Sequence, residues 1–268
     1  MNFRFDVIIV GDSSSGHAIL DKLATSKSPI KVAFISKSFK STTTHDYNNV
    51  TYFREEVAYV SYRHRLFCCF TKNGNSIFST HLIIASGLAY EPFVLNTKQL
   101  PYVRNSVDDV TEIAKDQSAL IVYNQASDVK FALDIAKKHK QVYLCTKEFD
   151  ISKSISAAML KKLNTAENIV VLSNAAINEV VCENSVVQKV TLDNYTDVDC
   201  SAIYAKTATK PALDFIPEKM LVRENDYPVV TEYCESTLMP KCFVVGSCLK
   251  KYTKTMEQNM IDIILKDF

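Results

Sequence analysis

Glycine is scarce in this chain and is missing from its middle. The 268 residues include only five glycines, and none of them lies between residues 88 and 245. Glycine lets a backbone come close to a phosphate, because it has no side chain and tolerates positive φ. The sequence therefore favours one nucleotide site, built from the two ends of the chain, over a second one in the middle.

The chain also lacks a charge excess and a long apolar run. Its 31 Lys and Arg against 30 Asp and Glu give a formal charge of +1, which favours neither a nucleic acid nor an anionic membrane as a partner. The stretch Val7–Val10 is far shorter than the ~18 apolar residues that span a bilayer. The start, Met1-Asn2-Phe3-Arg4, does not resemble a signal peptide. We expect a cytoplasmic protein that binds no nucleic acid and no membrane.

The eight cysteines include no C-x-x-C pair, and neither cysteines nor histidines show metal-ligand spacing. Most cysteines lie in apolar, strand-like runs, which indicates buried, reduced thiols. Cys68 and Cys69 are adjacent in such a run, so their side chains should point to opposite faces of a strand. We expect no metal, and no Ser/His/Asp arrangement identifies a catalytic residue.

Two βαβ patterns follow one another along the chain. The first has strands over 5–10 and 30–35 around a helix over 15–26. The second has a helix that we expect to run through Lys138 with Ser127 as its N-cap. The repeated unit predicts an α/β fold of two doubly wound, Rossmann-like, three-layer lobes. The other expected elements are a meander over 50–78, strands over 80–84, 119–123, 141–145, 168–172 and 242–245, antiparallel strands over 176–205, and helices over 106–115, 154–164 and 252–266.

The turn of the first βαβ unit runs from Gly11 to Gly16. In a G-x-G-x-x-G turn the first glycine makes the bend, the second admits a pyrophosphate and the third lets helix pack on strand. Ser13 replaces the middle glycine. Its Cβ narrows the space through which a pyrophosphate would approach the backbone, although its hydroxyl can donate to a phosphate. The acid expected after the second strand, to bond a ribose, is replaced by Ser36 and Lys37. Phosphate binding and a purely structural turn both remain open, as do a phosphate contact and solvent exposure for Lys37.

Four stretches in the same order resemble the pyridine nucleotide-disulfide oxidoreductase superfamily, and most closely its low-molecular-weight thioredoxin reductases. They are Asp6–Gly16, His81–Gly87, Ala208–Phe215 and Pro240–Ser247. The resemblance implies an FAD-binding-type domain over 1–100 and 212–268, with a NAD(P)-binding-type domain inserted over 101–211. It also implies a homodimer and a redox protein as partner.

The resemblance further implies FAD as the cofactor and a set of residues that bind it. These residues are Gly11, Asp12, Ser13, Ser14, Ser15, Gly16, Ser36, Lys37, Val57, Ala85, Ser86, Gly87, Gly246, Ser247 and Met256. Ser247 stands where the family has Asp, which weakens the expected bond to the ribityl chain. Tyr62, Phe67 and Phe70 could flank the isoalloxazine or pack in the core, and His17 could approach the flavin or lie on the helix surface.

The inserted domain departs from the family. Its turn, Tyr123–Asp128, has no glycine, and Asp128 at the helix start would oppose a pyrophosphate. Thr146–Phe149 stands where an arginine cluster would hold NADPH, and the C-x-x-C motif expected before Ala119 is absent. We therefore predict a divergent thioredoxin reductase-like flavoprotein that takes electrons from a non-nicotinamide donor or partner. The alternatives are a non-catalytic binding or regulatory subunit and an NADH-dependent flavin oxidase or reductase with a relaxed site.

Overall fold

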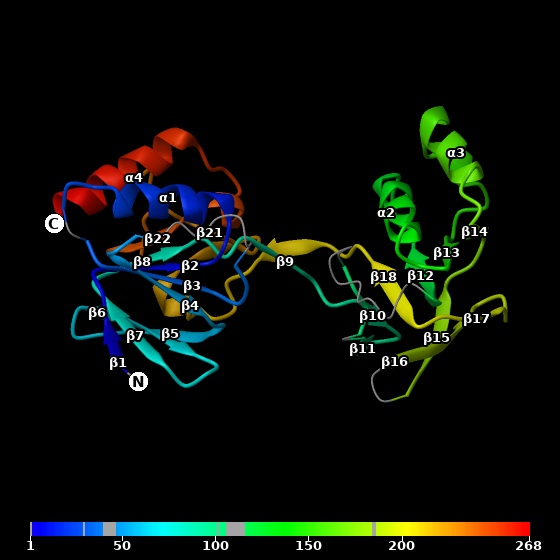
Figure 1. The fold of residues 1–268 in the computed structure, drawn as a ribbon, viewed down its shortest axis with the longest axis horizontal. Helices are drawn as coiled ribbons and strands as arrows, with labels where there is room; N and C mark the ends of the chain where they lie inside the picture. The colour runs from blue at the N-terminus through cyan, green and yellow to red at the C-terminus, as the bar shows by residue number, and fades with distance from the viewer. Residues whose placement is uncertain (1, 29, 40–46, 101, 106–115, 184–185) are drawn as a thin grey trace. The chain divides into compact units, whose positions relative to one another are not determined.

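The computed structural model describes residues 2–28, 30–39, 47–100, 102–105, 116–183 and 186–268. The chain forms two compact units (Figure 1). Unit 1 comprises Met1–Ala89 and Thr209–Phe268, and unit 2 comprises Tyr90–Ala208. The chain thus leaves unit 1 before residue 100, because Phe93, Leu100 and Tyr102 pack on a core cluster of unit 2. No helix within the described ranges has both the length and the apolar content that a membrane span requires.

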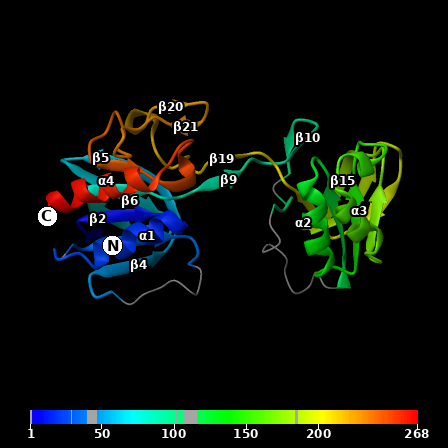
Figure 2. The ribbon, with the colours of Figure 1, turned by 90° about the horizontal axis from the view of Figure 1, so that it is seen from above.

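Unit 1 is built on a parallel five-stranded sheet of order β22-β8-β2-β3-β4. The strands are β2 (Val7–Val10), β3 (Val32–Ser36), β4 (Val50–Arg54), β8 (His81–Ile84) and β22 (Cys242–Val244). The helices α1 (Ser14–Ala24) and α4 (Lys254–Lys266) lie side by side over one face (Figure 1 and Figure 2). All four residues of β2 are buried, since both faces of the sheet are covered. A parallel strand that is covered on both faces has a continuous apolar sequence, and the sequence of β2 has this form.

A second sheet, of order β1-β7-β6-β5, covers the opposite face of the parallel sheet in unit 1 (Figure 1). Its strands are β1 (Asn2–Arg4), β5 (Val57–Arg63), β6 (Leu66–Thr71) and β7 (Ser76–Ser79). Strands β5, β6 and β7 form an antiparallel meander, and β1 pairs with β7 in parallel. Smaller elements complete the unit: β9 (Leu88–Tyr90), which pairs with β19 (Thr209–Pro211), β20 (Arg223–Glu224), β21 (Tyr227–Pro228), η4 (Glu218–Met220) and η5 (Gly246–Cys248).

Unit 2 repeats the parallel arrangement, with a four-stranded sheet of order β14-β13-β12-β18. Its elements are β12 (Ser118–Val122), α2 (Ser127–Ala136), β13 (Gln141–Cys145), η3 (Ile151–Lys153), α3 (Ala157–Asn164), β14 (Ile169–Leu172), β15 (Ile177–Glu183), β16 (Val186–Leu192), β17 (Asp197–Asp199), β18 (Ala202–Ala205) and the hairpin β10 (Val94–Leu95) with β11 (Lys98–Gln99). One core cluster lies between the sheet and the two helices, and another joins the sheet to β16 and β17.

These elements confirm the predicted α/β class and correct two details. Residues 202–205 were expected in an antiparallel sheet, but β18 pairs with β12 in parallel. Ser127 is the first residue of α2, whose N-cap is Ala126 without a side-chain cap. The carboxylate of Asp128 instead accepts hydrogen bonds from the N–H groups of Asn124 and Gln125, just before the helix. The helix expected over 106–115 lies outside the described residues.

Candidate functional site

The main candidate site is a cavity of about 770 Å³ in unit 1. Its lining includes the turn after β2, the residues that follow β3 and β8, and the segment that joins β4 to β5. The carboxyl ends of parallel strands are where α/β sheets bind ligands, because the loops there diverge and leave a crevice. The predicted residues Gly11, Asp12, Ser13, Ser36 and Lys37 all line this cavity, together with Val57, Ser86 and Gly87.

Gly11 and Gly16 hold this turn against β8 and α1. Gly11 has φ +112°, and a Cβ placed on it would lie 2.4 Å from the carbonyl oxygen of Ala85. A Cβ on Gly16 would lie 2.7 Å from the carbonyl oxygen of Gly11. Neither position can take a side chain unless the backbone moves, because the chain segments pack closely at this turn.

The two ends of the chain meet at the start of α1. Gly246 has φ +72°, and a Cβ there would lie 2.9 Å from the hydroxyl of Ser15. A Cβ on Gly87 would lie 3.6 Å from the hydroxyl of Ser247. The predicted residues from 11–16, 85–87 and 246–247 are therefore brought together, although Ser14, Ser15, Gly16, Ala85, Gly246 and Ser247 lie outside the lining of the cavity itself.

Ser13 acts as the N-cap of α1. Its Oγ accepts a hydrogen bond from the backbone N–H of Gly16 at 3.1 Å. The N–H groups of Ser14 and Ser15 belong to the first turn, where helix geometry provides no intrahelical partner. This end of α1 thus presents backbone donors and the positive end of the helix dipole.

His17 forms a hydrogen bond through Nε2 with the carboxylate of Asp12. Its ring lies 5.0 Å from that of Phe34, and both side chains of the pair are largely buried. The sequence allowed His17 either to approach the flavin or to lie on the helix surface. In the structure its side chain instead bonds to Asp12.

At the far end of the cavity, Ser36 and Lys37 have local partners. The Ser36 hydroxyl donates to the carbonyl of Ser38 at 2.8 Å. The Lys37 side chain is 82% exposed, and its ammonium lies 4.0 Å from Glu56, which also pairs with Lys72 at 2.6 Å. The hydrogen bond from Lys72 lowers the pKa of Glu56, and Lys37 adds to the effect. The negative charge of Glu56 is therefore balanced by Lys72 and Lys37.

Sequence reasoning missed Glu55, which also lines the cavity. The amide of Asn75 donates to Glu55 Oε1 at 2.7 Å. Oε2 is buried and accepts no hydrogen bond from any described residue. The register pairs Ser36 with Arg54, so Glu55 follows β4 next to the place where β3 ends. The expected acid follows β4 instead of β3, and only the order of the strands in the sheet shows that the two places are adjacent.

Met256 lies in the first turn of α4, whereas the aromatic residues Tyr62, Phe67 and Phe70 lie in the meander. The N–H of Met256 donates to the hydroxyl of Thr253, the N-cap of α4, at 3.2 Å. Phe67 is fully buried in the core of unit 1, and Tyr62 packs against it. Phe70 lies on the other face of the meander and is 40% exposed. The three aromatic residues therefore do not flank one common space.

In unit 2, the corresponding turn is filled by the chain itself. The Asp128 carboxylate accepts hydrogen bonds from the backbone N–H groups of Asn124 at 2.9 Å and Gln125 at 3.0 Å. Asp128 is only 1% exposed. A carboxylate that already accepts from these donors would repel a phosphate and compete with it for them.

All eight cysteines are free, and all but Cys182 are buried, which confirms the predicted buried thiols. Cys69 lies in the core of unit 1, and Cys68 lines a cavity on the opposite face of the meander. Among the described residues, no group of three or more His, Cys, Asp or Glu side chains could hold a metal ion.

Comparisons with known proteins agree with this architecture. The model of the pyridine nucleotide-disulphide oxidoreductase family matches residues 39–246. No curated protein matches the chain. Similar solved structures include the thioredoxin reductase of Lactococcus lactis in its FR conformation, with TM-score 0.68 and 14% identity over 98% of this chain and 97% of that one.

Two further structures share the fold. Bacillithiol disulfide reductase Bdr from Bacillus cereus has TM-score 0.63 and 15% identity, over 99% of this chain and 100% of that one. The thioredoxin reductase of T. acidophilum has TM-score 0.61 and 14% identity, over 98% of this chain and 97% of that one. At such identities the likeness is one of fold.

Proposed function

Because the chain belongs to the pyridine nucleotide-disulphide oxidoreductase family, we propose that unit 1 is an FAD-binding domain and unit 2 a degenerate NAD(P)-binding domain. The observation that carries the proposal is the meeting of both chain ends at a turn where Gly11 and Gly16 admit no side chain. The donors at the start of α1 suit a pyrophosphate. The cavity continues from this turn to Ser36, Glu55 and Val57, which suit an adenosine.

Glu55 takes the role of the acid that is missing after β3. A buried carboxylate oxygen without a hydrogen-bond partner is unfavourable, and a ribose hydroxyl is a donor that would satisfy it. Asn75 holds the other oxygen and so fixes the side chain. Ser36 can contribute its oxygen as an acceptor while its own proton is donated to Ser38.

Bound FAD would supply electron transfer through its isoalloxazine ring. The electrons would come from a redox protein partner rather than from NAD(P)H, since Asp128 occupies the donors of the unit 2 turn and the chain has no C-x-x-C. The same two observations favour a second candidate, a non-catalytic binding or regulatory subunit. A homodimer is expected from the family resemblance, and light scattering coupled to size-exclusion chromatography would test it.

FAD titration of the apoprotein, followed by calorimetry, tests the proposed site. We expect saturable binding, and we expect Glu55→Gln to weaken it about tenfold, as for one charge-assisted hydrogen bond. Glu56→Gln is the matched control, because Glu56 already pairs with Lys72 and Lys37. An apoprotein that takes up no FAD would contradict the function, whereas binding with equal effects of the two variants would contradict only the role of Glu55.

A further inference from the structure

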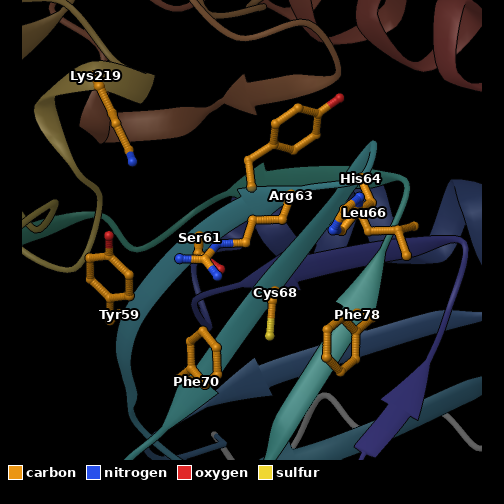
Figure 3. Close-up of a pocket in the computed structure, with 10 residues that line it drawn as sticks. Tyr59, Ser61, Arg63, His64, Leu66, Cys68, Phe70, Phe78 and Lys219 are labelled. Atoms are coloured by element: carbon orange, nitrogen blue, oxygen red, sulfur yellow. The ribbon is translucent and has the colours of Figure 1, made fainter.

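Unit 1 contains a second cavity, of about 600 Å³, on the face of the meander that points away from the core (Figure 3). The strand register places Ser61, Cys68 and Phe78 in one row across β5, β6 and β7. All three line the cavity, and Figure 3 shows the Cys68 thiol between Phe70 and Phe78. None of these lining residues also lines the cavity of about 770 Å³ that we propose binds FAD, which is called the FAD-type cavity below.

This face of the meander is apolar where solvent would favour polar residues. Alternation along the strands sends Val60, Phe67 and Cys69 into the core, so the outer face of an antiparallel sheet should be polar. It carries instead an aromatic pair, Tyr59 and Phe70, whose rings stack 6.5 Å apart at 28°. They are 45% and 40% exposed. Exposed apolar surface that lines a cavity is a feature of ligand-binding grooves.

The charges around this cavity are all of one sign. Arg63 ends β5, His64 follows it in the β5–β6 turn, Lys219 comes from η4, and no Asp or Glu lines the cavity. Neither Arg63 nor Lys219 forms an ion pair with any residue in the described part of the chain. Figure 3 shows the Lys219 ammonium directed toward the strands, on the side of Tyr59. The cavity therefore has a positive potential and selects anions.

We propose that this cavity binds a small aromatic anion. The flat ring packs against Tyr59 and Phe70, and its carboxylate, sulfonate or phosphate group meets Arg63 and Lys219. Arginine suits such an oxyanion because it donates two parallel hydrogen bonds, and lysine adds a compact charge. The site is separate from the FAD-type cavity, so it does not depend on the proposed function.

Fluorescence titration with 8-anilinonaphthalene-1-sulfonate (ANS) tests this proposal, because ANS is an aromatic anion. N-phenyl-1-naphthylamine has the same rings without the sulfonate and should bind more weakly. We expect Arg63→Gln and Lys219→Gln each to weaken ANS binding about fivefold, the upper range for one exposed charge pair, and to leave binding of the neutral probe unchanged.

Three controls make the result decisive. Lys251→Gln removes an exposed cation outside the cavity, and Glu55→Gln alters only the other cavity, so both should bind ANS as the wild type does. Ser61→Phe should narrow the cavity and weaken ANS binding, with far-UV circular dichroism to verify folding. Equal binding of both probes, or ANS binding that survives loss of Arg63 and Lys219, would overturn the proposal. ANS binding that disappears on self-association would assign the face to a second copy of the chain instead.

Discussion

Replacement of Gly11 by alanine tests whether the turn after β2 needs glycine for space as well as for backbone conformation. The new Cβ would lie 2.4 Å from the carbonyl oxygen of Ala85 and 2.6 Å from Cα of Ser86. Both are backbone atoms, so relief requires movement of the chain. Overpacking costs about 1–3 kcal/mol, and a left-handed conformation costs a residue other than glycine about 1–2 kcal/mol. We expect Gly11→Ala to lower the free energy of unfolding by about 3 kcal/mol.

Gly74 offers a matched control within the same unit. It also has positive φ, +83°, but a Cβ there would meet no atom within 4 Å. Gly74→Ala should therefore lose only about 1 kcal/mol. Urea unfolding followed by far-UV circular dichroism measures both values, and hydrogen exchange assigns the loss to unit 1. Gly11→Ala should also abolish FAD binding, whereas Gly74→Ala should retain it. Equal destabilisation by the two variants would refute the steric reasoning.

Three further predictions concern other parts of the chain. Burial lowers the pKa of His81 and of His139, so the unfolded chain binds more protons below its histidine pKa of about 6.5. Thermal scans should show the melting temperature falling from pH 7 to pH 5, and a flat profile would contradict this. Arg65 has φ +63° in the β5–β6 turn, so Arg65→Gly should raise stability by about 1 kcal/mol in urea titrations; no gain would argue against strain there. Asp128→Ala should destabilise unit 2 by about 1–3 kcal/mol, as measured by hydrogen exchange, whereas Asp134→Ala, in an exposed pair with Lys137, should have little effect.

The first βαβ unit was predictable because its signals are local. The four buried residues of β2 form a continuous apolar run, and glycines bound the turn that follows. The order of the four family-like stretches also implied that both ends of the chain would form one site. These inferences need only short-range patterns and a resemblance, and the pairing of β22 with β8 agrees with them.

The remaining features depend on tertiary structure. The apolar run of β18 suits either a parallel or an antiparallel strand, and only its pairing with β12 decides between them. The role proposed for Glu55 could be inferred only once the structure showed that β4 lies beside β3. The sequence predicted that Asp128 would oppose a phosphate, but not that its carboxylate would fold back onto the N–H groups of Asn124 and Gln125.

An anaerobic titration of the purified protein with NADH and then NADPH, followed by its absorption spectrum, tests the central claim most directly. We expect a flavin band at about 450 nm, either on purification or after addition of FAD. We also expect that neither nicotinamide bleaches this band, because Asp128 occupies the turn of unit 2. Rapid bleaching by NADH or NADPH would contradict the claim about unit 2, and a protein that stays colourless with added FAD would contradict the claim about unit 1.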